Sequence, residues 1–319
     1  MVKLKTVLIT GASGYIGSFL ARYLQDQGYR VRVLVRQIPD YLKNSGFEIF
    51  VGDLTEKQSL VNSCKDIDVV VHAAALNETE VSDLNKATNV NVLGTQNMID
   101  IAVAESVKRF IKLSTFHVYT LNNLVKGIIN EQTPTEPLNN YSLTLKKAEE
   151  ICEKYKTKIE IVILRISNCY GAPIDYRVDR WSLLISDLCK QACLNGKICL
   201  KSDGSQKRDF VSLSDISKAI EIMINAVKSE IKDPIFNVGG EDIRSIGEVA
   251  ELVSETFFKI YGKEIPVEYV TDLRTDKTKK EFIFSIEKIK KLGYKPVSDM
   301  REEIMKVMEL CEEMKNGKA

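Results

Sequence analysis

A glycine-rich turn near the start of the chain constrains its fold more than any other feature. Residues 11–17 read Gly-Ala-Ser-Gly-Tyr-Ile-Gly, between a β-branched run at 6–9 and an amphipathic stretch at 17–27. Glycines between a strand and a helix let the backbone approach a pyrophosphate, whose charge meets the N–H groups at the helix start. The spacing is G-x-x-G-x-x-G rather than the commoner G-x-G-x-x-G, so a tight strand-to-helix turn without a ligand is the alternative interpretation.

Short β-branched runs alternate with longer amphipathic segments along the chain. The sequence predicts strands at 6–9, 31–35, 48–50, 69–72, 110–113, 160–164 and 236–238. It predicts helices at 17–27, 89–105, 141–155, 181–192, 245–261 and 300–314. This alternation is typical of a parallel sheet with helices on both faces. After Gly171 the pattern loosens, and a second, smaller lobe is expected to begin there.

Composition excludes several classes of protein. Lys and Arg number 45 against 44 Asp and Glu, so there is no global charge for binding nucleic acid or an anionic membrane. The apolar stretches fall far short of the roughly 20 residues that span a bilayer. Seven cysteines, scattered and without a Cys-x-x-Cys pair, indicate buried thiols in a cytoplasmic protein. With only two histidines, no zinc set is recognisable, and we predict no metal site.

A series of short motifs occurs in an order that resembles one enzyme family. The motifs are the three glycines of residues 11–17, Gly52-Asp53-Leu54, His72-Ala73-Ala74-Ala75, Asn91-Val92-Leu93-Gly94-Thr95, Ser114-Thr115-Phe116-His117-Val118-Tyr119, Pro137 before Tyr141, Leu164 to Gly171, Arg208-Asp209-Phe210-Val211 and Asn237-Val238-Gly239-Gly240. The chain resembles the extended short-chain dehydrogenases/reductases, in the branch of nucleotide-sugar epimerases and dehydratases. The resemblance runs from Thr6 to about Pro296.

The resemblance implies a Rossmann-type, doubly wound parallel α/β sheet with a smaller C-terminal substrate-binding lobe. Residues 1–166, with about 208–238, would form the NAD(P)-binding domain. Residues of about 167–207, with 239–319, would form the substrate-binding lobe. Family members commonly pair as homodimers through the helices that match residues 89–105 and 141–155.

The resemblance also implies that the chain binds NAD or NADP. The matching residues are Gly11, Ser13, Gly14, Tyr15, Ile16, Gly17, Asp53, Leu54, Ala73, Ala74, Ala75, Asn91 and Tyr141. Asp53 matches the position that hydrogen-bonds the adenine amine. Folds that choose NAD place an acid at the end of the second strand, where this chain has Val35 followed by Arg36. An arginine there favours the 2′-phosphate of NADP, although it can also stack on adenine.

The expected substrate is a nucleotide sugar, oxidised or reduced at a sugar carbon, with C4 the expected position. Tyr141 matches the catalytic acid/base, and Thr115 matches the hydroxyl that steadies the reacting oxygen. His117 lies two residues after Thr115 and can face the sugar. Positions that hold the diphosphate are matched by Asn168, Arg208 and Arg274. Arginine suits that role because its fork makes bidentate, charge-assisted contacts.

One residue departs from the family pattern. Family members carry Lys four residues after the tyrosine, where its ammonium lowers the phenol's pKa. This chain has Leu145 there, and Lys146 lies about 100° further around the helix. Without that lysine, Tyr141 is expected to keep an ordinary pKa of roughly 10. Proton transfer is then slow, or another group such as His117 or Lys146 assists it.

The subclass stays open between epimerase, dehydratase, dehydrogenase and ketoreductase. One alternative is a reductase of a non-sugar ketone or a steroid-like alcohol. Asn168 and Arg208 argue against it, since an uncharged substrate needs no diphosphate ligands. The other alternative is a cofactor-binding protein whose catalysis is lost or weak because Leu145 replaces the family lysine.

Overall fold

The computed structural model describes residues 5–119, 126–269 and 281–317. Its strands are β1 (Thr6–Thr10), β2 (Arg30–Val35), β3 (Glu48–Val51), β4 (Val69–His72), β5 (Arg109–Thr115), β6 (Lys126–Ile129), β7 (Glu160–Ile166), β8 (Asn168–Tyr170), β9 (Ile198–Leu200), β10 (Lys207–Ser212), β11 (Ile235–Val238), β12 (Asp242–Ser245), β13 (Val267–Tyr269) and β14 (Glu281–Phe284). Its helices are α1 (Tyr15–Asp26), α2 (Leu84–Ala87), α3 (Gly94–Ala104), α4 (Asn140–Lys154), α5 (Leu184–Asn195), α6 (Leu213–Asn225), α7 (Ile246–Tyr261), α8 (Glu287–Lys290) and α9 (Met300–Asn316). Short helical turns are η1 (Asp40–Leu42), η2 (Lys57–Leu60), η3 (Thr88–Leu93), η4 (Phe116–Val118) and η5 (Lys228–Glu230).

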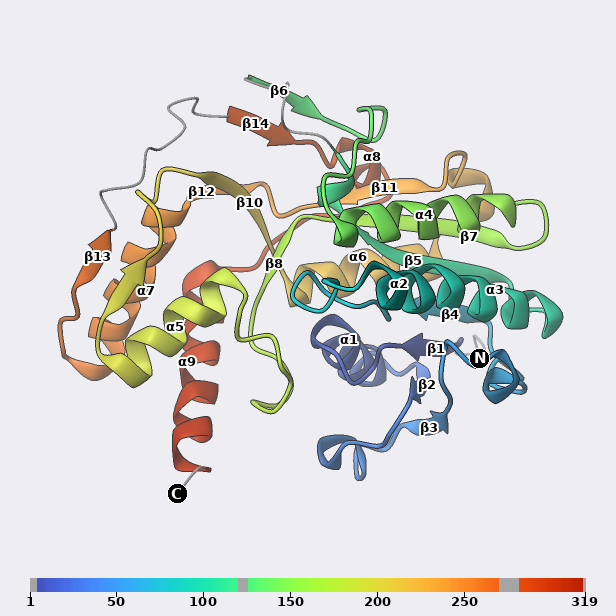
Figure 1. Ribbon diagram of the computed structural model, residues 1–319, viewed down its shortest axis with the longest axis horizontal. Helices are drawn as coiled ribbons and strands as arrows, with labels where there is room; N and C mark the ends of the chain where they lie inside the picture. The colour runs from blue at the N-terminus through green and yellow to red at the C-terminus, as the bar shows by residue number, and fades with distance from the viewer. Residues whose placement is uncertain (1–4, 120–125, 270–280, 318–319) are drawn as a thin grey trace.

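The predicted doubly wound parallel sheet is confirmed. Seven parallel strands lie in the order β11-β7-β5-β4-β1-β2-β3. The order reverses between β1 and β4, and in open sheets of this kind ligands bind at the carboxyl ends of the strands at such a point. Figure 1 shows this sheet and its helices on one side of the molecule, with α5, α7 and α9 on the other.

The central strands are largely apolar because both faces of the sheet are covered. In β1, Val7 and Ile9 pack with residues of α1 and α6 on one face. Leu8 packs on the opposite face with residues of α3 and α4. Burial on both faces explains why these strands read as continuous apolar runs rather than as alternating patterns.

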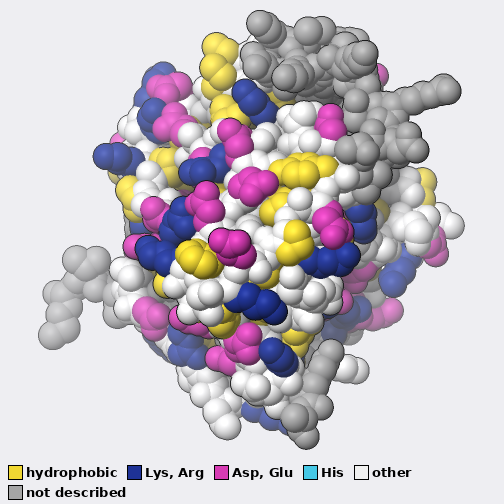
Figure 2. Space-filling view, turned by 90° about the vertical axis from the view of Figure 1, so that its left-hand side faces the viewer, with side chains coloured by type: hydrophobic (Ala, Val, Ile, Leu, Met, Phe, Trp, Pro, Cys, Tyr) yellow, Lys and Arg dark blue, Asp and Glu magenta, His cyan; other side chains and the backbone are white. Residues whose placement is uncertain are grey.

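A second lobe is built from α5, α7 and α9, with a hydrophobic core of its own. Strands β8, β10 and β12 form a three-stranded sheet, and β9 pairs with β13. The capping box that begins α7 is confirmed, because Ser245 Oγ accepts from the Glu248 N–H and Glu248 from the Ser245 N–H. On the face of the second lobe, Lys and Arg side chains intermingle with Asp and Glu (Figure 2). Among the described residues, no helix combines the length and apolar character needed to cross a bilayer.

Two predicted helices differ in the structure. The segment predicted as one helix at 89–105 contains a π-helical turn, η3, before α3 begins at Gly94. There, the Thr95 hydroxyl donates to the Asn91 carbonyl at 2.6 Å, and hydroxyls that bond the preceding turn disturb regular helices. The helix predicted at 181–192 begins only at Leu184, after an irregular segment.

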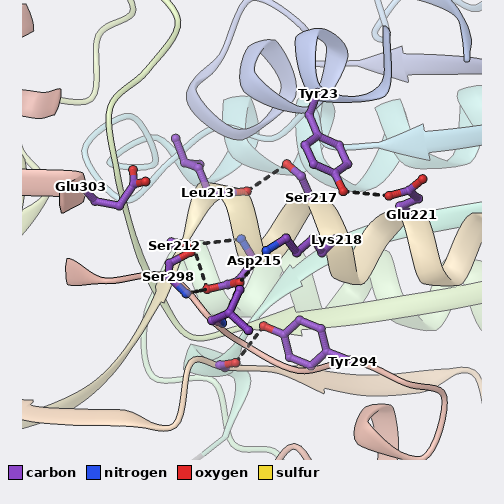
Figure 3. A network of polar contacts seen from close by, with 12 residues as sticks. Tyr23, Ser212, Leu213, Asp215, Ser217, Lys218, Glu221, Tyr294, Ser298 and Glu303 are labelled. Atoms are coloured by element: carbon purple, nitrogen blue, oxygen red, sulfur yellow. Dashed lines mark hydrogen bonds and ion pairs between the residues drawn. The ribbon is translucent and has the colours of Figure 1, made fainter. Parts of the chain in front are cut away.

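A buried carboxylate joins α6 to the segment that leads into α9. Asp215 accepts from the Ser212 hydroxyl at 3.0 Å and from the backbone N–H groups of Val297 and Ser298 at 3.1 Å each (Figure 3). Lys218 lies 3.7 Å from the same carboxylate. Asp215 therefore holds α6, which packs on the seven-stranded sheet, to the segment that leads into α9 of the second lobe.

Candidate active site

The glycine turn brings the start of α1 against the end of β4. Gly11 has φ +69°, and a Cβ there would lie 2.7 Å from the Ala74 backbone. A Cβ on Gly17 would lie 2.3 Å from the Gly11 carbonyl oxygen. The N-cap, Gly14, makes no side-chain cap, and the first turn of α1 holds no acidic residue. The N–H groups and positive dipole at this helix start therefore suit an anion.

Other residues predicted to bind the cofactor follow the carboxyl ends of neighbouring strands. Arg36 follows β2 and is exposed, Asp53 and Leu54 come after β3, and residues 73–75 follow β4. The Asp53 Oδ1 accepts from the N–H and hydroxyl of Thr55, both at 2.8 Å. These residues thus lie along one edge of the sheet, beside the glycine turn.

Three residues of the predicted cofactor set make contacts inside the protein. The Tyr15 hydroxyl donates to the Gly171 carbonyl at 2.6 Å, which links α1 to the end of β8. The carbonyl of Ser13 accepts from the Tyr41 hydroxyl at 2.7 Å. Ile16 packs against the main core. The side chains of Tyr15 and Ile16 therefore support the turn from within the protein.

Asn91 fixes the position of α4. Its Oδ1 accepts from the Leu76 N–H at 2.7 Å, and its Nδ2 donates to the Thr144 hydroxyl at 3.0 Å. Thr144 lies one turn after Tyr141 on α4. The Asn91 amide, predicted to bind cofactor, thus joins the segment after β4 to the helix that carries Tyr141.

Tyr141, Thr115 and His117 come together at the end of β5. An N-terminal capping box of Asn139 and Ser142 starts α4, so Tyr141 lies in its first turn. The Thr115 hydroxyl accepts from the His117 backbone N–H at 3.2 Å and acts to lower the pKa of the Tyr141 phenol. The His117 and Tyr141 rings meet edge-on, with centroids 6.3 Å apart. A phenol with a hydroxyl and an imidazole beside it suits proton transfer at an alcohol or ketone oxygen.

The expectation that Tyr141 keeps an ordinary pKa is wrong. Burial raises the pKa of Tyr141 well above 10, and the negative charges of Glu78 and Cys169 raise it further. Arg180 and the Thr115 hydroxyl act in the opposite direction. The sequence showed the missing lysine but not how far the protein around the phenol disfavours its charge.

His117 is neutral at neutral pH. It keeps contact with solvent, yet burial lowers its pKa below 6.5, and the positive charge of Arg208 lowers it further, against the effect of Glu78. Arg208 is thereby brought to the same site from the second lobe. A neutral imidazole beside Thr115 can accept a proton or a hydrogen bond.

Lys146 is paired with a carboxylate of its own helix. The side chain at 145, Leu145, is buried, and the Lys146 ammonium lies 3.4 Å from Glu149. Glu149 in turn is bound by Arg165 and by the Ser114 hydroxyl. Lys146 therefore belongs to a charge network on the flank of α4.

The predicted diphosphate ligands lie on adjacent strands of the second lobe. The Asn168 Nδ2 on β8 donates to the Asp209 carbonyl at 2.9 Å and so holds β8 to β10. Arg208 donates to the Gln206 side chain at 3.1 Å. In the register of β10 and β12, Arg208 lies opposite Arg244. Arg274 lies outside the described residues.

Sequence reasoning missed Glu78, Cys169 and Arg180. Glu78 lies in the loop after β4, and Arg180 lies in the irregular segment before α5. Their side chains form an ion pair, with Arg180 Nη2 3.2 Å from Glu78 Oε1. The two are 102 residues apart in the sequence, so no local pattern signals their pairing. Cys169 is the middle residue of β8 and acts on the Tyr141 phenol from the second lobe.

A separate open cavity of about 670 Å³ lies on the second lobe, between the turn at 203–205 and α7. Arg244, Glu251 and Tyr269 are among the residues that line it. Of the predicted active-site residues that the structure describes, none lines this cavity. It is therefore distinct from the site around Tyr141.

Comparison with known proteins gives consistent matches over the chain. A model of the NAD dependent epimerase/dehydratase family matches residues 7–239. The dTDP-D-glucose 4,6-dehydratase of Homo sapiens is 29% identical over 325 residues, which cover 96% of this chain and 89% of that protein.

Two solved structures cover nearly the whole chain. The UDP-glucuronic acid 4-epimerase of Bacillus cereus, in complex with NAD, is 26% identical with a TM-score of 0.79, over 97% of this chain and 99% of that one. MoeE5, in complex with UDP-glucose and NAD, is 25% identical with a TM-score of 0.76, over the same shares.

Proposed function

The chain belongs to the NAD dependent epimerase/dehydratase family, and on this premise we propose that it is an NAD-dependent enzyme acting at C4 of a nucleotide-activated sugar. The observation that carries the proposal is the meeting of Thr115, His117 and Tyr141 at the end of β5, with Arg208 of the second lobe acting on His117. The first three side chains suit the chemistry of a sugar hydroxyl, and the arginine suits a diphosphate. The relative and the structures compared above are a 4,6-dehydratase, a 4-epimerase and a protein holding UDP-glucose and NAD.

The glycine turn fits the pyrophosphate of NAD. No Cβ fits at Gly11 or Gly17, and the N–H groups at the start of α1 have no side-chain cap. Residues 73–75 and Asp53 lie on the same edge of the sheet, where we propose that they hold the adenosine. When bound, NAD supplies the acceptor for a hydride leaving the sugar carbon.

The residues of the chain supply the proton chemistry. We propose that the Tyr141 phenolate removes the proton of the C4 hydroxyl while the C4–H bond breaks, which leaves a ketone at C4 and a protonated phenol. The Thr115 hydroxyl donates to the same sugar oxygen and steadies the charge on it. His117, neutral at this site, accepts a hydrogen bond from a neighbouring sugar hydroxyl.

The diphosphate is assigned to Arg208 and Asn168, with Arg274 a further prediction. If Arg208 binds it, Arg208→Ala weakens nucleotide-sugar binding by about 1.5–3 kcal/mol and leaves NAD binding nearly intact. Calorimetry with UDP and UDP-glucose measures both affinities. Unchanged affinity for every nucleotide diphosphate favours the alternative of a non-sugar ketone.

The test of the function is turnover. Purified protein with NAD is incubated with UDP-glucose, UDP-glucuronic acid and dTDP-glucose, and NMR follows the sugar product. We expect a change of configuration at C4, or a 4-keto-6-deoxy sugar, that Tyr141→Phe slows at least a hundredfold. Absence of turnover with tight NAD binding favours a binding protein. Turnover of non-sugar ketones alone favours the reductase.

We also propose that NADP is accepted at least as well as NAD. Arg36 follows β2 and is exposed, so it is able to meet a 2′-phosphate. Titration of both cofactors into wild type and Arg36→Ala tests this. A strong preference for NAD that survives the substitution contradicts it.

A homodimer through α3 and α4 remains a prediction. Sedimentation equilibrium decides between monomer and dimer. A charged substitution at Leu93, which is exposed just before α3, then tests whether these helices form the contact.

A further inference from the structure

We propose that Arg180 is a positioning residue that places a positive charge beside Tyr141, in place of the lysine absent at position 145, and that Glu78 limits how much of this charge acts on the phenol. The inference rests on the proposed function for the role of Tyr141 as acid/base. It concerns a pair of residues from two different parts of the fold.

The geometry begins with the loop after β4. Leu76 and Val81 are buried, and Tyr141 packs against the cluster that they form. The Asn140 side chain also donates to the Val81 carbonyl at 3.0 Å. Glu78 lies between these two anchors, so its carboxylate is held near the start of α4.

Arg180 reaches this loop from the second lobe. Its Nη2 lies 3.2 Å from one Glu78 oxygen and 3.4 Å from the other. Its Nη1 is buried and has no hydrogen-bond partner among the residues that the structure describes. Glu78 is 46% exposed, whereas Arg180 is only 16% exposed. The carboxylate is thus partly screened by water, and it compensates the guanidinium only in part.

The charges that act on the phenol come from both lobes. Glu78 and Cys169 favour its protonated form, while Arg180 and the Thr115 hydroxyl favour the phenolate. His117 meets the ring edge-on and is neutral. Lys146 is bound to Glu149 instead. Arg180 therefore supplies a positive charge that acts on Tyr141 from the second lobe.

An arginine from the second lobe differs from a lysine on α4 in two respects. Its charge does not depend on pH, because a guanidinium stays protonated. Its position depends on the segment before α5, where Arg177 and Asp175 form a separate ion pair. The effect of the Arg180 charge on Tyr141 therefore depends on how this segment lies against the loop that contains Glu78.

The direct test reads the phenol without any substrate. Difluorotyrosine in place of Tyr141 titrates at lower pH than tyrosine, and its ¹⁹F shift reports its own ionisation. We expect Arg180→Gln to raise the pKa of this side chain by about one unit, and Glu78→Gln to lower it by about one unit. Arg180→Lys should keep most of the wild-type value. Adding Leu145→Lys to Arg180→Gln should bring the pKa back down.

Arg177→Gln is the matched control. It removes an arginine from the same segment, but its partner is Asp175, 2.7 Å away. The ¹⁹F titration should not move in this variant. Circular dichroism and NAD affinity, measured on all variants, show that each is folded.

Kinetics supply the second readout. In single turnover with UDP-glucose, Arg180→Gln should slow hydride transfer about tenfold at neutral pH, and raising the pH by one unit should restore the loss. A titration that does not move overturns the inference, and so does a rate loss that is equal at every pH. If the titration moves as expected while no nucleotide sugar turns over, the inference stands and the proposed function falls.

Discussion

Two glutamate–arginine pairs of the molecule, Glu149 with Arg165 and Glu78 with Arg180, differ in how completely their polar groups are satisfied. Arg165 on β7 binds Glu149 through two nitrogens, at 3.0 and 2.7 Å, and the Ser114 hydroxyl adds a third bond at 2.6 Å. Both side chains are at most 2% exposed. Arg180 binds Glu78 through one nitrogen, leaves another without a partner among the described residues, and remains partly exposed.

The difference separates a structural pair from one that is able to change partners. Glu149 and Arg165 cannot part without leaving a buried charge, and Arg165 also stacks on the Tyr119 ring at 4.7 Å. Glu78 and Arg180 can part at small cost because water takes up the carboxylate. A group beside a reacting atom benefits from such freedom, whereas a group that fixes α4 on the sheet does not.

Breaking the buried pair should have the largest effect on stability. Arg165→Leu leaves the Glu149 carboxylate buried without its main partner, so we expect a loss of about 3–5 kcal/mol in the free energy of unfolding. Urea denaturation measures it. Removing both charges with Glu149→Leu in the same chain should recover a large part of the loss. A single variant as stable as wild type contradicts the structural role of this pair.

Lys112 is a further buried charge, and unlike Arg165 it has no hydrogen-bond partner among the described residues. This lysine lies on β5 and is fully buried. Burial lowers its pKa from 10.5 to about 8, despite the nearby charge of Glu149. We expect Lys112→Met to stabilise the protein at pH 7 by up to about 3 kcal/mol.

The stability difference between wild type and Lys112→Met should change with pH in a definite direction. Below pH 8 the lysine is protonated in both folded and unfolded chains, so wild type carries the full penalty. Between pH 8 and 10.5 the unfolded chain binds more protons, and wild-type stability rises with pH. The advantage of Lys112→Met should therefore shrink over this range. Lys147→Met, an exposed position on α4, is the control and should show no such trend.

Breaking the pair between the lobes should have the smallest effect on stability. Glu78→Gln removes a half-exposed carboxylate, and we expect a change below about 1 kcal/mol in the free energy of unfolding. The same urea titration measures it, with added salt as a check on its electrostatic part. A loss as large as that of Arg165→Leu would make this pair structural as well, and would end the distinction drawn above.

The sheet could be predicted because its signals are local, whereas the roles of Thr115 and Tyr141 were predicted from the resemblance of their motifs to a family. Buried parallel strands read as apolar runs, and the run at 69–72 coincides with β4. The break in the helix at 89–105 could not be predicted, because it depends on how the Thr95 hydroxyl turns toward the Asn91 carbonyl.

The charges around the phenol could not be predicted either. Glu78 and Arg180 lie in irregular segments without periodicity, and only tertiary structure brings them together. Lys112 gives no signal in the sequence, since a single lysine in a strand usually reaches solvent. The pKa of Tyr141 depends on burial and on charges such as Glu78 and Arg180, so the loss of one lysine was too narrow a basis for predicting it.

The carboxylate of Asp215 helps to hold the two lobes together. Val297 and Ser298, from the segment that leads into α9, donate hydrogen bonds to this buried charge, each worth about 1.5–3 kcal/mol. On the side of Arg180, Tyr15 of α1 packs with Val178 and its hydroxyl donates to the Gly171 carbonyl. The position of Arg180 relative to Tyr141 therefore depends on contacts made outside the active site, in which neither residue takes part.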